Sequence, residues 1–255
     1  MQFYANEFLF FTKKRKAIML SIKNLNKSYG KKQILYDVNI DIEAGDIYGF
    51  IGKNGAGKTT TIKCVVGLND YKEGEIYVNG INIKKDPLKA KSVMAYIPDN
   101  PELYEFMRGT EYLNFIANVY DLSEEKRKSN IEKYLKIFDL EDAIKDFISS
   151  YSHGMKQKLA LIAALMHEPK LLILDEPFVG LDPTATHYLK EEFKEMVKSG
   201  AAIFFSTHVL EVAQSLCNKI SILKDGRIIA QGDTKEVTEK ASLEDIFMEL
   251  MKNEI

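Results

Sequence analysis

Residues 52–60, Gly52-Lys53-Asn54-Gly55-Ala56-Gly57-Lys58-Thr59-Thr60, decide the fold, because they carry the pattern G-x-x-x-x-G-K-[ST]. The mostly apolar residues 46–51 before them are typical of a buried strand, and residues 61–68 after them continue as a helix. A strand, a glycine-rich loop and a helix in this order form a phosphate-binding unit. Glycine lacks a Cβ atom, so the loop backbone can turn its N–H groups inward around a polyphosphate. The start of the helix near Gly57 adds the positive end of its dipole.

The loop therefore predicts a nucleoside triphosphate site with a magnesium ion. Lys58 is expected to reach the β- and γ-phosphates and to take part in catalysis, and the Thr59 hydroxyl suits Mg²⁺. The predicted nucleotide-binding residues of the loop are Gly52, Asn54, Gly55, Ala56, Gly57, Lys58, Thr59 and Thr60.

The composition indicates a globular chain without a general affinity for polyanions. Its 255 residues, 45% hydrophobic and 28% charged, suit one large domain or one domain with a substantial insertion. The net charge of −2 leads us to expect no nucleic-acid partner. Cys64 and Cys217 have no zinc-type spacing, which favours two reduced, buried thiols. No apolar run approaches the ~18 residues that would span a bilayer.

The chain is expected to fall into three regions. Residues 1–18 place aromatic residues before a basic run, the reverse of a secretory signal. We interpret them as a disordered leader or the product of an upstream start codon, with a weak membrane-surface anchor as the alternative. Residues 19–235 are expected to form the main domain, in which about 100–168 are helical, and residues 236–255 a helical tail.

The pattern of apolar segments predicts an α/β fold. Three early segments, residues 20–25, 34–42 and 75–80, suggest a small antiparallel sheet, and four later ones, residues 92–97, 170–175, 201–206 and 219–223, suggest a parallel sheet with crossover helices. Within the helical insert, we expect Thr110 to cap one helix and Ser123 to open another. Asp225-Gly226 predicts a tight hairpin turn after the last parallel strand.

Two strand ends carry side chains suited to hydrolysis. The apolar strand 171–174 ends in Asp175, which can hold Mg²⁺ opposite Thr59, and in Glu176, which can take a proton from an attacking water. The next strand ends at His208, which could hydrogen-bond the γ-phosphate. Because the carboxyl ends of parallel strands meet at one edge of a sheet, we expect these side chains to converge.

A second anion-binding element follows the helical insert. Residues 151–158, Tyr-Ser-His-Gly-Met-Lys-Gln-Lys, predict a helix that opens at Gly154, with Ser152 ahead of it. Taken alone this is an ordinary helix cap. The phosphate loop does not need another anion site, so this element suggests a ligand that belongs to another subunit.

The five motifs together resemble the nucleotide-binding subunit of an ATP-binding cassette (ABC) transporter. They are the phosphate loop and residues 151–155, 172–177, 180–183 and 206–208, in register over residues 20–235. The resemblance implies a P-loop NTPase core with a mostly parallel sheet, a small antiparallel β subdomain and an inserted α-helical subdomain. It also implies a homodimer or paired cassette, joined head to tail, with two ATP molecules at the seam.

The same resemblance assigns roles at that seam and beyond it. Ser152 and Gly154 would bind the ATP held by the opposite subunit, Tyr29 would stack on adenine, and Asp182 would lie near the partner's phosphate loop. A separate transmembrane permease would dock near residues 99–104, which places the chain at the cytoplasmic face of the membrane. Residues 151–155 correspond to the signature motif of the family, and this motif is similar to that of bacterial export-type (ABC-2-like) cassettes.

Two positions depart from the family pattern. Asp99 stands where the family has a glutamine that senses Mg²⁺, and a carboxylate there can still bind the metal. His153 and Met155 replace a glycine and a glutamine of the signature. Ser152 and Gly154 remain, so we expect a competent ATPase.

Two other classes share part of the pattern. A soluble ABC ATPase that serves a non-transport assembly, such as an iron–sulfur scaffold, would have the same dimer and chemistry. A GTP switch protein would share the phosphate loop, but it needs Asn-Lys-x-Asp, and residues 218–221 lack the final aspartate.

Overall fold

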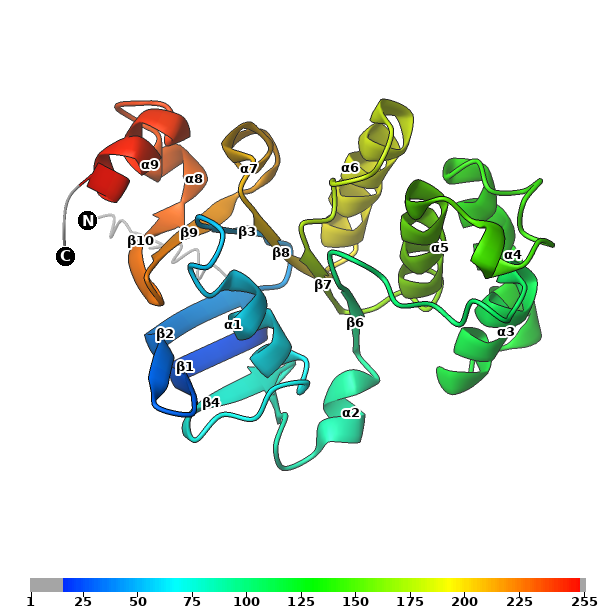
Figure 1. Ribbon diagram of the computed structural model, residues 1–255, viewed down its shortest axis with the longest axis horizontal. Helices are drawn as coiled ribbons and strands as arrows, with labels where there is room; N and C mark the ends of the chain where they lie inside the picture. Colours follow the sequence, from blue (N-terminus) through cyan, green and yellow to red (C-terminus); the bar gives the residue numbers. More distant parts are fainter. Residues whose placement is uncertain (1–15, 253–255) are drawn as a thin grey trace, which may run out of the picture.

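The computed structural model describes residues 16–252. Two sheets lie side by side, and the helices of residues 109–165 form a group at one end (Figure 1). The strands are β1 Ile18–Tyr29, β2 Lys32–Glu43, β3 Ile47–Ile51, β4 Glu73–Val78, β5 Ile81–Asn82, β6 Met94–Ile97, β7 Leu171–Asp175, β8 Ala202–Thr207, β9 Lys219–Lys224 and β10 Arg227–Asp233. The helices are α1 Lys58–Val65, α2 Pro87–Lys91, α3 Gly109–Val119, α4 Glu124–Ile137, the 3₁₀ turn η1 Ile148–Ser150, α5 His153–Leu165, α6 Pro183–Lys198, α7 Leu210–Leu216, α8 Thr234–Val237 and α9 Leu243–Lys252.

The larger sheet has the strand order β10-β9-β3-β8-β7-β6. All neighbouring pairs in it are parallel except β9 and β10, which the hairpin turn Asp225-Gly226 joins. Both turn residues have positive φ, 47° and 77°, as a two-residue hairpin requires, so the predicted turn is confirmed. Because β3, β7 and β8 are parallel neighbours, the chain segments that follow them leave the sheet at the same edge.

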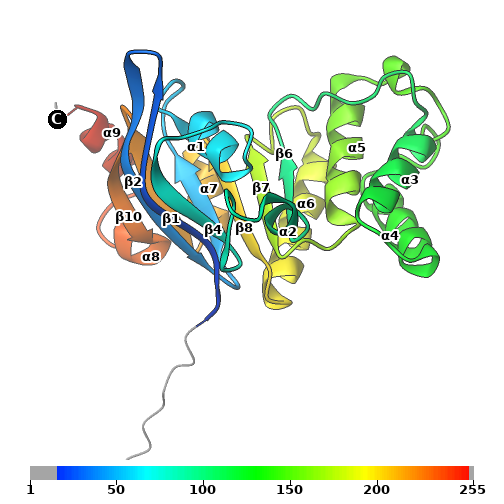
Figure 2. The ribbon, with the colours of Figure 1, turned by 90° about the horizontal axis from the view of Figure 1, so that it is seen from below.

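The smaller sheet, β2-β1-β4-β5, is antiparallel, as the sequence predicts. Its strands β1 and β2 have 12 residues each and extend well beyond the predicted segments. Figure 2 shows this sheet edge-on beside α1. The buried face of α1, with Ile62 and Val65, belongs to the same apolar core as Leu20 of β1 and Phe204 of β8. The phosphate-loop helix is therefore held between the two sheets.

The helices α3, α4 and α5 and the turn η1 lie between β6 and β7 in the chain, as expected for residues 100–168. Ser123 caps α4 as predicted and accepts a hydrogen bond from the Lys126 N–H at 3.4 Å. The prediction for Thr110 is wrong, because α3 begins at Gly109 with Arg108 at the N-cap. Glu111 reaches back to accept the Arg108 N–H at 2.8 Å, which fixes the helix start two residues earlier.

Other predictions concern the ends of the chain, the thiols and the membrane. Of the proposed leader, residues 1–15 lie outside the described residues, and Ile18 already opens β1. Cys64 and Cys217 are both free and buried, as expected, and burial raises the pKa of the Cys64 thiol to about 11. Within residues 16–252, no helix has the length and apolar character that a bilayer crossing requires.

Candidate functional site

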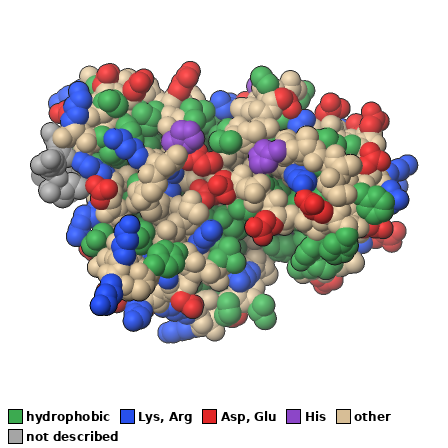
Figure 3. All heavy atoms as spheres, viewed as in Figure 1, with side chains coloured by type: hydrophobic (Ala, Val, Ile, Leu, Met, Phe, Trp, Pro, Cys, Tyr) green, Lys and Arg blue, Asp and Glu red, His purple; other side chains and the backbone are tan. Residues whose placement is uncertain are grey.

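A hollow of about 670 Å³ lies where the phosphate loop meets the carboxyl ends of β7 and β8. Figure 3 shows acidic and histidine side chains gathered near the centre of this face. The predicted site residues that line the hollow are Tyr29, Asn54, Gly55, Gly57, Lys58, Thr59, Thr60, Asp99, Asp175, Glu176 and His208. The structure thus brings together residues that are up to 179 positions apart in the sequence (208 − 29).

The phosphate loop is held by close backbone approaches that glycine permits. Gly57, the N-cap of α1, has a φ of 111°, and a Cβ atom there would lie 2.7 Å from a methyl carbon of Leu35. A Cβ atom on Gly52 would lie 2.6 Å from the carbonyl oxygen of Leu223 in β9. Gly226 of the hairpin donates its N–H to the Ala56 carbonyl at 3.0 Å. Gly52 and Ala56 do not line the hollow, and they fix the loop against β9 and its hairpin.

Lys58 lies inside the loop that precedes it. Its side chain is only 6% exposed, and its Nζ donates to the Gly52 carbonyl at 2.7 Å and to the Lys53 carbonyl at 3.5 Å. The same Nζ lies 3.5 Å from Oε1 of Glu176. The ammonium group therefore stands between the phosphate loop and the carboxylates at the end of β7.

Glu176 leaves the sheet in a left-handed backbone conformation, with a φ of 50°. One carboxylate oxygen faces Lys58, and the other lies 3.0 Å from Nδ1 of His208 and accepts the His208 N–H at 3.3 Å. Two groups that carry or can carry positive charge thus face the predicted general base, one on each side.

The donor set at this edge suits a magnesium ion that also binds phosphate. Asp175 is 1% exposed, and its Oδ2 is buried with no hydrogen-bond partner among the described residues. Burial raises the pKa of the Tyr96 hydroxyl, and the carboxylates of Asp175 and Asp99 raise it further. Within residues 16–252, no cluster of three His, Cys, Asp or Glu side chains could hold a metal by itself. Phosphate oxygens and water would have to complete the shell around Asp175 and Thr59, as is usual for Mg²⁺.

Of the second anion-binding element, residues 151–158, only His153 lines the hollow of its own chain. Ser152 is the N-cap of α5, accepts the Met155 N–H at 3.3 Å and is exposed. Neither Ser152 nor Gly154 lines the hollow, whereas His153 between them does. The predicted helix start at Gly154 therefore lies one residue too late, because the Ser152 cap lets the helix begin at His153.

This element packs against the segment that leads to Asp182. A Cβ atom on Gly180 would lie 2.8 Å from Cδ2 of His153. Asp182 caps α6 by accepting the Ala185 N–H at 2.8 Å, and it pairs with Lys158 of α5 at 2.8 Å. The Lys158 ammonium, and then the Ala185 N–H, lower the pKa of Asp182. The two segments that the sequence places at a subunit seam thus contact each other within one chain.

Tyr29 and Asp99 lie at the borders of the hollow. The Tyr29 ring is half exposed, with the Lys27 ammonium 4.5 Å from its centroid, and its hydroxyl accepts a hydrogen bond from Asn69 at 2.7 Å. Asp99 accepts the N–H of its neighbour Asn100 at 2.9 Å. An exposed aromatic face at the end of β1 is compatible with base stacking.

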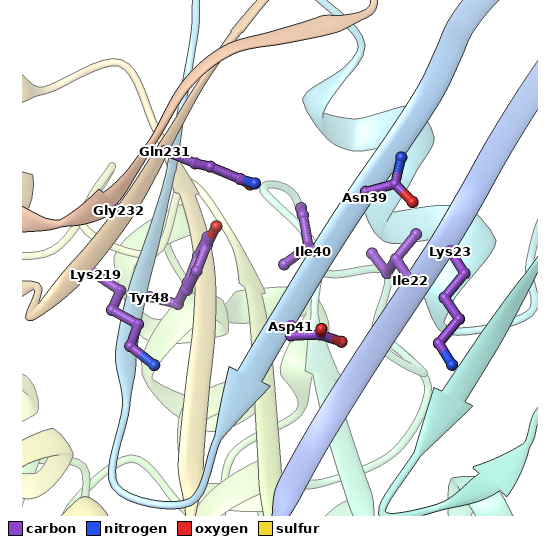
Figure 4. A pocket seen from close by; sticks show the side chains of 9 residues that line it. All are labelled: Ile22, Lys23, Asn39, Ile40, Asp41, Tyr48, Lys219, Gln231 and Gly232. Carbon is purple, nitrogen blue, oxygen red and sulfur yellow. The ribbon is translucent and has the colours of Figure 1, made fainter.

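A second hollow, of about 420 Å³, lies between β2 and β10 (Figure 4). Tyr48 and Gln231 face Ile40 across it. No predicted site residue lines it, and of its two lysines, Lys23 and Lys219, the second is already paired with Asp46 at 2.9 Å. We therefore place the candidate site at the phosphate loop.

The sequence predicted no site role for several residues that line or support the hollow. They include Ile34, Lys53, His153 and Val179, which line it, Lys158, which pairs with Asp182, and Ser206, which contacts Asp175. Ser206 had a signal, since it and Thr207 are polar residues at the end of the otherwise apolar strand β8, directly before His208. The pairing of Lys158 with Asp182 had none, because it depends on how α5 and α6 pack.

Comparison with known proteins identifies the family. The family model described as ABC transporter matches residues 35–179. The ABC-type transporter ATP-binding protein EcsA of Bacillus subtilis is 39% identical over 241 residues, which cover 92% of this chain and 98% of EcsA. The linearmycin resistance ATP-binding protein LnrL of the same organism is 36% identical over 214 residues, 84% of this chain and 69% of LnrL.

Solved structures agree with this result. The structure of an ATP-binding subunit of an ABC transporter superposes with a TM-score of 0.88 at 38% identity, and the match covers 91% of this chain and 99% of that one. A dimeric ATP-binding cassette bound to ADP and Pi has a TM-score of 0.76 at 23% identity, with 85% and 99% covered, and shows the shared fold. The mixed α/β fold predicted from the sequence is confirmed.

Proposed function

This chain belongs to the ABC transporter family as an ATP-binding subunit, and from this premise we propose that it hydrolyses ATP to drive a separate transmembrane permease. The observation that carries the proposal is the convergence of Lys58, Glu176 and His208 in the hollow beside the phosphate loop. A cation, a carboxylate base and an imidazole around one site form a set suited to phosphoryl transfer to water.

Glu176 acts as the general base. Without nucleotide its carboxylate is held between Lys58 and His208. A triphosphate attracts the Lys58 ammonium more strongly than one carboxylate does, because it presents several charged oxygens. Binding of ATP therefore draws Lys58 to the β- and γ-phosphates and leaves Glu176 free to accept a proton from water. His208 then donates a hydrogen bond to the γ-phosphate.

Thr59 and Asp175 would hold Mg²⁺, with Asp99 as a further oxygen donor at the same hollow. Once bound, the ion would neutralise phosphate charge. The buried, unpartnered oxygen of Asp175 supports this assignment, since a buried carboxylate oxygen without a partner is unfavourable unless a ligand completes it.

Two copies of the chain form a head-to-tail dimer. Ser152 and Gly154 do not line the hollow of their own chain, although His153 between them does, so they can bind the phosphates held by a neighbour. Tyr29 stacks on adenine, and Asp182 lies at the seam. The γ-phosphate then links the two surfaces, and hydrolysis weakens that link.

The permease docks on the helical insert. Tyr104, Phe106 and Phe115 are exposed and their rings pack together, with the Tyr104 centroid 5.8 Å from each of the other two. Figure 3 shows a hydrophobic patch in this region, beside α3. A patch of exposed aromatic residues is typical of a protein interface.

Binding to the permease would place this subunit at the cytoplasmic face of the membrane. We assign the subunit to the export-type cassettes. The relative LnrL, named for linearmycin resistance, supports this assignment.

The test combines an activity assay with co-purification. We expect Mg²⁺-dependent ATP hydrolysis by the purified chain, weaker hydrolysis of GTP, and recovery of an integral membrane protein with the tagged chain from detergent extracts. A preference for GTP would contradict the ATPase assignment. Recovery of a soluble assembly factor with the tagged chain, in place of a membrane protein, would instead support the iron–sulfur scaffold alternative. The family description does not favour that alternative.

A further inference from the structure

Ser206 is a buried polar residue next to the candidate catalytic carboxylates. It lies in β8 after the apolar residues 202–205 and is 0% exposed. In the parallel register of β7 and β8, Ser206 stands opposite Asp175. A hydroxyl in a buried strand needs hydrogen-bond partners, so the identity of those partners decides what the serine does.

The Ser206 hydroxyl donates one hydrogen bond and accepts another, and both partners lie at the end of β7. Ser206 Oγ donates to Oδ1 of Asp175, and it accepts the Glu176 N–H at 3.2 Å. The same N–H also lies 3.2 Å from the Ser206 carbonyl oxygen. One side chain therefore contacts both residues that the proposed mechanism uses at this strand end.

These two contacts have separate consequences. Because Ser206 binds Oδ1 of Asp175, the carboxylate plane is fixed and Oδ2 remains as its buried oxygen without a partner among the described residues. Because the Glu176 N–H is anchored, the left-handed turn at Glu176 is fixed, and that turn directs its carboxylate toward Lys58 and His208.

We propose that Ser206 is a positioning residue, which orients Asp175 toward a divalent cation and holds Glu176 in its catalytic direction. This inference rests on the proposed function and extends it to a residue that contacts neither nucleotide nor metal. Hydrogen-bond partners of metal-binding carboxylates typically contribute about 10–100-fold to metal affinity or activity.

The chain offers a matched control in Ser221 of β9. It is also 0% exposed, and its hydroxyl bonds the Tyr48 hydroxyl, away from the hollow. Ser206 and Ser221 even flank the same residue, since Phe50 of β3 pairs with Ser206 on one side and with Ser221 on the other. Removal of either hydroxyl deletes two side-chain hydrogen bonds, since Ser221 also bonds Oε1 of Gln231 at 3.5 Å, but only Ser206 contacts Asp175 and Glu176.

The test compares Ser206→Ala, Ser206→Thr and Ser221→Ala in the full chain. Mn²⁺ serves as the metal probe, and its binding in the presence of ADP is followed by electron paramagnetic resonance. We expect Ser206→Ala to weaken Mn²⁺ binding about tenfold and to lower kcat about 10–100-fold, with little change in the KM for ATP. The threonine variant keeps the hydroxyl and should restore both values. Ser221→Ala should lower the melting temperature about as much as Ser206→Ala does, and it should change neither the Mn²⁺ affinity nor kcat.

The outcomes separate this inference from the proposed function. Equal Mn²⁺ affinity and equal kcat in Ser206→Ala and Ser221→Ala would overturn the positioning role. The Ser206 hydroxyl would then contribute only to the stability of the fold. Failure of Ser206→Thr to recover Mn²⁺ binding, with its melting temperature unchanged, would overturn it as well. A wild-type chain that hydrolyses no ATP but binds Mn²⁺ in a Ser206-dependent manner would contradict the proposed function and support the role of Ser206.

Discussion

Replacement of Glu176 by glutamine is expected to lower ATP turnover by about 10²–10⁴, the usual contribution of a general base. Glutamine keeps the size of the side chain and a carbonyl oxygen that can face Lys58, but it cannot accept the proton of the attacking water. Binding of ATP should persist, because the phosphate loop is unchanged. Steady-state phosphate release and equilibrium binding of ATP, measured on the same preparation, give the two values.

The matched control for this variant is Glu192→Gln. Glu192 is 11% exposed, close to the 15% of Glu176, and it also pairs with a lysine, since Lys133 Nζ lies 2.9 Å from its Oε1. It does not line the hollow around the phosphate loop. Glu192→Gln should therefore keep its turnover. Wild-type turnover in Glu176→Gln would place the general base elsewhere.

Replacement of Lys58 by alanine is expected to weaken ATP binding about 10–100-fold. Each charge-assisted hydrogen bond contributes about 1.5–3 kcal/mol, and each 1.4 kcal/mol is about a tenfold change in affinity. The ammonium is buried within the loop and donates to its carbonyl groups, so alanine leaves this position without a positive charge. Titration with a fluorescent ATP analogue in the absence of hydrolysis measures the effect.

Lys219→Ala is the control for the loss of an ion-paired lysine. Lys219 pairs with the buried Asp46 at 2.9 Å and lies in the hollow between β2 and β10. Its removal should lower the melting temperature of the chain, because the ion pairs with Asp46 and Glu43 are lost. ATP affinity should stay within about twofold of the wild type, because the effect of a partly buried ion pair is local. If Lys58→Ala bound ATP as tightly as the wild type, the assignment of the phosphate loop would be wrong.

The fold followed from the sequence where one local pattern determined the backbone. The loop of residues 52–60 needs a strand before it and a helix after it, and the carboxylates that follow residues 171–174 indicate a strand end. The sequence did not determine every helix start. Thr110 is a good capping residue, but Glu111 satisfies the N–H of Arg108 and so moves the start of α3.

The candidate site followed from the sequence only in part. The parallel order of β3, β8 and β7 brings Lys58, Glu176 and His208 to one edge, and strand ends predict this convergence. The pairs between distant elements could not be predicted, because spacing along the chain contains no information on register. The hydroxyl of Ser206 contacts Asp175 because the two strands pair in one particular register, and a shift by one residue would separate them.

In the proposed dimer, each ATP site is completed by Ser152 and Gly154 of a neighbouring chain. The most direct measurement is the sedimentation of Glu176→Gln with saturating Mg²⁺ and ATP, beside a second variant that also carries Ser152→Ala. We expect ATP, but not ADP, to double the mass of the first variant, and Ser152→Ala to prevent the doubling while ATP still binds. A Glu176→Gln chain that binds ATP and stays monomeric, both alone and together with the proposed permease, would contradict the head-to-tail dimer.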